Sequence, residues 1–113
     1  MDEFIAANQV KINELRAQYG ELAIVQSAWG PVCVFRKPTF HDMLKFVSEY
    51  EHSGSPVVKA WAPIKLLEQI ILLPTKEEFA PLRERYGYEF ADQLCGEARM
   101  QFLPDGKSIA KKL

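Results

Sequence analysis

The chain has 113 residues, of which 48% are hydrophobic and 26% are charged. This composition excludes a disordered chain, and the length favours one packed domain, which we expect over residues 1–106, followed by a short basic, flexible tail over 107–113. Fourteen basic and fifteen acidic residues leave a net charge of -1, so no overall field attracts nucleic acid or an anionic membrane. We therefore expect neither as a partner.

The N-terminal residues and the cysteines indicate the cellular compartment of the protein. Met1-Asp2-Glu3-Phe4 carries acids where a secretory signal needs cations, and no apolar run reaches the roughly 20 residues that span a bilayer. Cys33 and Cys95 lie far apart without a CxxC pair, which favours buried thiols over a disulfide framework or a zinc site. The sequence predicts a cytoplasmic protein.

The first third of the chain predicts a helix followed by a β-hairpin. Apolar residues recur at nearly helical spacing from Glu3 to Tyr19, and Gly20 is a typical residue after a helix end. Two β-favouring runs, 22–26 and 32–35, are separated by the turn residues 27–31. Antiparallel pairing is expected because a short loop cannot connect parallel strands.

The stretch VCVFRKPTFHDM predicts a strand end and a helix start. Pro38 cannot donate to a sheet ladder, and Thr39 is suited to cap the next helix with Asp42 three residues later. That helix presents one apolar stripe, composed of Met43, Phe46, Val47 and Tyr50. Arg36 and Lys37 have no assigned role; a solvated edge is favoured over a partner contact.

The second half predicts further helices. Ser53–Pro56 is a linker or hinge candidate, and the apolar run 57–73 predicts a buried helix, either kinked at Pro63 or beginning near Ala62. Thr75 and Glu78 have capping-box spacing before a helix that continues to Gly87 and tolerates Pro81 only with local distortion. A last helix is expected from Glu89 to about Phe102, then a turn at 104–106. The predicted fold class is α+β, a mostly helical single domain with a short β-hairpin in its N-terminal third.

No arrangement of residues predicts a reaction. His41 and His52 lack metal-ligand spacing, and no nucleophile elbow, Walker A loop or dinucleotide-binding glycine motif occurs. Helix starts and i, i+4 pairs explain the carboxylates Glu77, Glu78, Glu84 and Glu89 better than acid–base catalysis does. We expect no enzymatic activity, no cofactor and no metal.

The abundant large apolar side chains leave two interpretations open. They fill the core, or some of them form an exposed groove for a partner helix; the core is the favoured interpretation. The basic residues Arg83, Arg85 and Arg99 with Tyr86 and Tyr88 are interleaved with acids, which favours a solvated helix face over a phosphate-binding surface.

The order of elements resembles that of small tail assembly chaperones of long-tailed bacteriophages. The resemblance covers roughly residues 12–102 and rests on INELRAQYGELAIV, a strand ending in VFRKPT, the acidic helix HDMLKF, a long apolar helix, and LLPTKEEFAPLRERYG. It implies a non-enzymatic protein that binds the tape-measure protein, and possibly the tail-tube protein, and keeps the tape-measure protein soluble until the tube polymerises. The family commonly has a frameshifted longer form, for which an A-rich codon run at Lys111-Lys112 is a candidate slippery site.

The resemblance leads to a hypothesis of helix-in-groove binding, with a homo-oligomer as an additional possibility. The expected partner-binding residues are Trp61, Ile64, Leu67, Phe79 and Tyr86, with the Ser53–Pro56 segment as a hinge that opens their surface. Two alternatives stay open: a structural tail component such as a terminator or joining protein, and a small cytosolic regulatory interaction protein.

Overall fold

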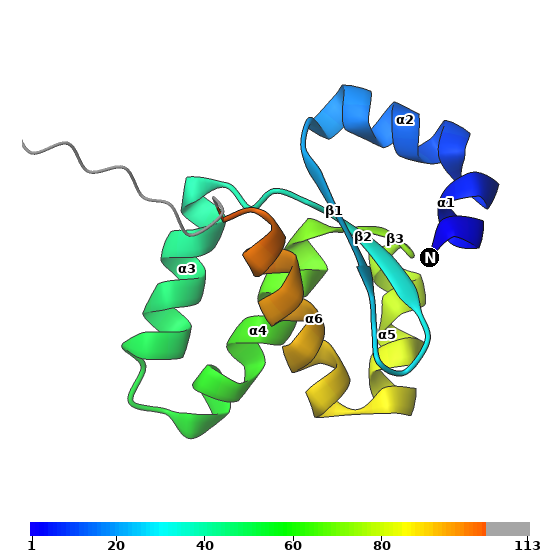
Figure 1. Cartoon of the computed structure of the whole chain (residues 1–113). Coiled ribbons are helices and arrows are strands. Elements are labelled where there is room, and N and C mark those ends of the chain that lie inside the picture. The colour runs from blue at the N-terminus through cyan, green and yellow to red at the C-terminus, as the bar shows by residue number, and fades with distance from the viewer. Residues whose placement is uncertain (104–113) are drawn as a thin grey trace, which may run out of the picture.

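The computed structural model describes residues 1–103. Its elements follow the chain in the order shown in Figure 1: α1 (Asp2–Ala7), α2 (Gln9–Tyr19), β1 (Leu22–Gln26), β2 (Val32–Arg36), α3 (Phe40–Glu51), α4 (Pro56–Ile70), β3 (Ile71–Leu73), α5 (Lys76–Tyr86) and α6 (Tyr88–Gln101). The described part is thus an α+β domain, mostly helical with a small antiparallel sheet, as the sequence predicts. The turn expected at 104–106 and the tail expected at 107–113 lie outside the described residues.

The predicted hairpin is confirmed, and a third strand joins it. β1 and β2 pair antiparallel from Leu22 opposite Arg36 to Gln26 opposite Val32. β3 pairs antiparallel with β2, which gives the sheet order β1-β2-β3. The prediction that the helix continues to Leu73 is therefore wrong, because α4 ends at Ile70 and β3 follows directly. The backbone is already extended at Ile71 (ψ 135°), and Pro74 disfavours helical geometry at the residue before it.

Helices cover both faces of the sheet. Ala23, Val25, Cys33 and Phe35 belong to the main core. The helical side of that core comes from α3, α4, α5 and α6, through Phe46, Ala62, Ile64, Leu66, Leu67, Ile70, Phe79, Phe90, Ala91, Leu94, Cys95 and Ala98. The opposite face carries Val32 and Leu73, which lie beside Phe4 and Asn8 of the N-terminal helices. α1 and α2 accordingly lie across the sheet from α3 and α4 in Figure 1.

The predicted N-terminal helix is divided at Asn8. The Asn8 side-chain amide donates to the Phe4 carbonyl at 2.8 Å, and its backbone leaves the helical region at φ -116°. An asparagine side chain that bonds the local backbone competes with helix continuation. The prediction that this segment is helical is confirmed, but the prediction of one continuous helix over residues 3–19 is wrong.

The helix starts predicted at Thr39 and Thr75 are confirmed. Thr39 and Thr75 both form capping boxes, with Asp42 and Glu78 as the reciprocal partners. Of the two alternatives for the next helix, a start near Ala62 is wrong, because α4 starts at Pro56 with Ser55 as its cap and contains Pro63 in its interior. Proline suits the first helical turn, where its missing N–H has no partner to lose. The hinge role suggested for Ser53–Pro56 stays a prediction.

Candidate protein-binding site

The structure separates the five expected partner-binding residues. Trp61 is on the surface with 45% of its area exposed, and the Arg83 guanidinium carbon lies 5.4 Å from its ring centroid. Tyr86 is partly buried against Phe90, with ring centroids 5.2 Å apart.

The other three residues, Ile64, Leu67 and Phe79, are buried in the main core. They fill the space that α4 and α5 enclose with α6, so the five residues form no common exposed surface in this structure. Their role in partner binding, through an opening at Ser53–Pro56, stays a prediction.

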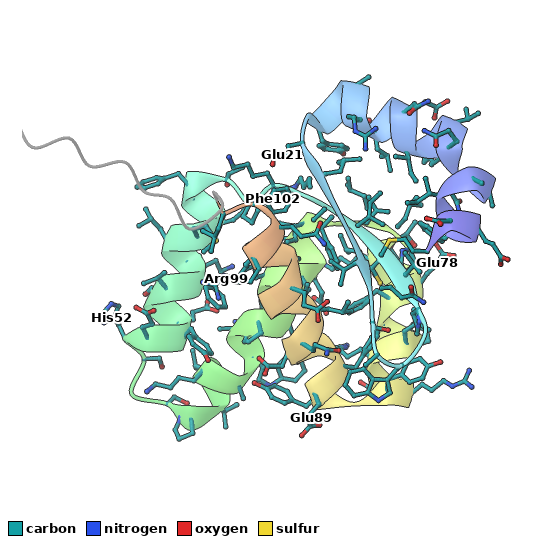
Figure 2. All side chains as sticks on the ribbon, in the orientation of Figure 1. Glu21, His52, Glu78, Glu89, Arg99 and Phe102 are labelled. Carbon is teal, nitrogen blue, oxygen red and sulfur yellow. The ribbon has the colours of Figure 1, made fainter. Side chains whose placement is uncertain are left out.

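The described residues assemble no metal cluster. No group of three His, Cys, Asp or Glu side chains between residues 1 and 103 is placed to hold a metal ion. His41 and His52 are both exposed, and Figure 2 shows His52 at the end of α3. Within the same range, no helix is long and apolar enough to cross a membrane.

The two thiols are placed as buried apolar groups. Cys33 lies in β2 and Cys95 in α6, both inside the main core. Burial raises the pKa of each thiol from an ordinary value of 9.0 to about 12. A thiol with such a pKa is protonated at neutral pH and makes a poor nucleophile.

Both cysteines should therefore resist thiol reagents in the folded protein. We expect reaction with 5,5′-dithiobis-2-nitrobenzoate at least about a hundredfold more slowly than in urea, where both thiols should react fully. The absorbance of the released thiolate measures the rate. A thiol that reacts in native buffer as fast as in urea would contradict its placement in the core.

A hollow between α3 and α4 has charged side chains on its walls. It has a volume of about 230 Å³. On its walls Lys65 pairs with Glu49 at 3.6 Å, and Asp42 pairs with Arg36 at 2.9 Å. Both carboxylates on these walls therefore already have cationic partners within the fold.

A second hollow, between the start of α3 and the end of α6, has a different character. Its volume is about 180 Å³, and we call it the α3–α6 groove; it is lined by Lys37, Pro38, Met43, Arg99, Phe102 and Leu103. Figure 2 shows Arg99 on the last turn of α6 and Phe102 directly after the helix, both on the side of α3. Four of the six lining residues are apolar and two are cations. Aromatic residues, Met and Arg are enriched at protein interfaces, and this groove contains one of each.

Exposed apolar side chains are close in sequence to the groove residues of both helices. Phe40 is 80% exposed and Leu44 is 54% exposed on the outer surface of α3. Their i, i+4 spacing places them together, and Phe40 lies one turn before the groove residue Met43. Met100 and Leu103 are exposed large apolar residues at the end of α6. Clustered exposed apolar side chains beside a hollow are typical of interaction sites.

The walls of the groove are fixed to the rest of the fold. Arg36, at the end of β2, pairs with Asp42 at 2.9 Å and donates to the Gln69 carbonyl at 2.9 Å, which joins the start of α3 to the end of α4. On the other wall, the Gln101 side chain donates to the Ile24 carbonyl at 2.9 Å and accepts from the Ile24 N–H at 3.2 Å. The groove is therefore largely formed before any partner arrives.

These contacts also bear on the roles of Arg36 and Lys37, which the sequence did not decide. Arg36 is a partly buried structural residue, so the solvated edge is wrong for it, and the partner contact stays untested. Lys37 is mostly exposed, lies 4.0 Å from Glu21 and lines the groove.

Sequence reasoning missed the exposed apolar residues next to the groove because it followed the inward apolar stripe of α3. Phe40 and Leu44 lie off that stripe. Large apolar side chains outside the buried stripe of an amphipathic helix are the signal that points to this surface.

Comparison with known proteins finds a solved structure with a similar fold. Neither a protein-family model nor a curated protein matches this sequence. The structure is similar to that of an uncharacterised protein from Bacillus stearothermophilus, with a TM-score of 0.66 and 19% sequence identity over 90% of this chain and 98% of that one. At this identity the likeness shows a shared fold and carries no functional assignment.

Proposed function

We propose that this protein is a non-enzymatic binding protein that receives an apolar helical segment of another protein in the α3–α6 groove. The observation that carries the proposal is the hollow lined by Pro38, Met43, Phe102 and Leu103, with the exposed Phe40 and Leu44 beside it. A helix laid there would remove these side chains from water, at about 25 cal/mol for each Å² of apolar surface buried.

The partner that we propose is the tape-measure protein of a long-tailed phage. Support comes from the resemblance to tail assembly chaperones, because the stretch VFRKPT that contributes to it supplies Lys37 and Pro38 to the groove and Arg36 to its support. The protein would cover apolar stripes of this rod-like client in the host cytoplasm until tail-tube subunits replace it.

The proposal predicts that a tape-measure protein is encoded beside this chain, and co-expression of the two proteins tests it. The wild-type chain should form a complex and raise the soluble fraction of the client, and Leu44→Glu should abolish both effects because it places a charge beside the groove. Val10→Glu is the matched control, since Val10 is an exposed apolar residue on α2, outside the lining of the groove. That control variant should behave like the wild type.

Two results would contradict the proposal. One is the absence of a complex between the wild-type chain and the client. The other is a purified chain that forms closed rings by itself, as a structural tail component does.

A further inference from the structure

Arg99 stands out among the groove residues. It projects from α6 towards α3, as Figure 2 shows, and its guanidinium carbon lies 4.6 Å from the centroid of the Phe46 ring. Phe46 is buried in the core, so Arg99 lies on an apolar support with its side chain only partly exposed. A guanidinium in such surroundings interacts more strongly with a carboxylate than it would in open water.

The other partly buried arginines already have carboxylate partners. Arg36 lies 2.9 Å from Asp42, and Arg83 lies 3.5 Å from Glu68. Among the residues that the structure describes, Arg99 has no such ion pair and contacts the Phe46 ring instead. Of the three partly buried arginines between residues 1 and 103, two have a carboxylate partner there, and the third, Arg99, lines the groove.

The second cation of the groove is also available. Lys37 is 4.0 Å from Glu21, and both side chains are 59% exposed. An exposed pair at that distance holds its partners weakly. The groove thus combines an apolar floor with two positive charges, which favours an acidic occupant and disfavours a basic one.

We propose that the α3–α6 groove selects amphipathic helices with a carboxylate at the edge of their apolar stripe, and that this carboxylate pairs with Arg99. The inference rests on the proposed function and specifies the chemistry of the bound segment. The apolar stripe would contact Met43, Phe102 and the exposed side of α3, while the carboxylate reaches the guanidinium. The chain's own segment 107–113, with three lysines and no acid, has the wrong charge for this position.

Two synthetic peptides test the charge preference. Both form an amphipathic helix of about five turns with leucines on one face; one carries glutamates beside the leucines, and the other carries glutamines at the same positions. Titration of each labelled peptide with the full chain, followed by fluorescence anisotropy, gives the two affinities. The wild-type protein should bind the glutamate peptide about tenfold more tightly, as expected for one charge-assisted hydrogen-bonded pair.

Variants of the chain then assign the preference to Arg99. Arg99→Met keeps an apolar contact with Phe46 and should bind both peptides equally, whereas Arg99→Lys should retain part of the preference. Arg85→Met is the matched control, because Arg85 lies 5.3 Å from the Tyr86 ring, with its side chain outside the groove lining. It should leave the preference unchanged. Urea unfolding of each variant checks that the chain is folded.

Asp105, beyond the described residues, provides a further test. Asp105→Asn should leave the preference as it is; a preference that appears only in this variant would mean that the chain's own carboxylate occupies the site, and would overturn the inference. Equal binding of the two peptides by the wild type would also overturn it, while the proposed function stands if the tape-measure complex forms. Failure to bind either peptide or the client would remove both.

Discussion

Replacing Phe79 by alanine should lower the free energy of unfolding by about 3 to 5 kcal/mol, the usual cost of emptying an aromatic position in a core. Phe79 is fully buried, and its ring stacks on Phe90 with centroids 5.9 Å apart. Phe90 in turn contacts the rings of Trp29 and Tyr86, so the removed ring leaves a space that its neighbours cannot close without moving. Urea denaturation followed by circular dichroism measures the change.

Trp61→Ala is the matched control for this prediction. Both positions carry aromatic residues that the sequence groups together as partner-binding, but Trp61 is largely on the surface and contacts Arg83. We expect a loss below about 1.5 kcal/mol, between a surface substitution and a partly buried one. Similar losses for Phe79 and Trp61 would contradict the division of the five residues into core and surface.

The second large effect is expected from Asp42→Ala, which should lower the free energy of unfolding by about 2 kcal/mol. The Asp42 carboxylate accepts from the Thr39 N–H at 2.9 Å and from Arg36 at 2.9 Å, so its loss removes half of a capping box and a partly buried ion pair. It also leaves Arg36 in place without its charge partner. Urea denaturation at neutral pH measures the loss.

The same carboxylate should make stability depend on pH. Burial raises the pKa of Asp42, but the Thr39 backbone, the side chains of Arg36 and Thr39, and the charge of Arg36 lower it more, so it lies below its ordinary value of 3.8. Because the folded pKa is the lower one, the stabilisation is present above the ordinary value and is lost as the pH falls through the folded one.

Urea midpoints measured from neutral pH to about pH 2 test this sign. Asp42→Asn should lose less stability over that acidic range than the wild type, because it has no carboxylate to protonate. Asp92→Asn, which alters an exposed aspartate of α6, is the control and should follow the wild type. An Asp42→Asn curve parallel to the wild-type curve would contradict the role of this ion pair in acid stability.

Local signals predicted much of the fold. A threonine three residues before an acid marks the starts of α3 and α5, because the reciprocal hydrogen bonds of a capping box are made within one turn. β3 was missed for the opposite reason. Its strand geometry depends on pairing with β2, which is distant in sequence, and the apolar run from Ile70 to Leu73 continues the composition of the helix before it.

The candidate site was harder to predict than the fold. The five residues selected from the sequence are large and apolar, but size and polarity do not show which side of a helix meets the core once several helices pack together. Leu67 and Trp61 lie on the same helix, and only the packing of α4 between α3, α5 and α6 makes one buried and the other exposed. The α3–α6 groove joins residues about 60 positions apart, a juxtaposition that periodicity cannot reveal.

The contact between Gln101 and Ile24 has a consequence for solubility. β1 is an edge strand of five residues, LAIVQ, without a charged side chain. An uncharged edge of this kind can template pairing with a strand of another molecule. The Gln101 amide occupies the outward N–H and C=O of the central residue, Ile24, as the peptide group of an added strand would. A side chain from the last turn of α6 thereby blocks the middle of this edge against pairing with a strand of another molecule.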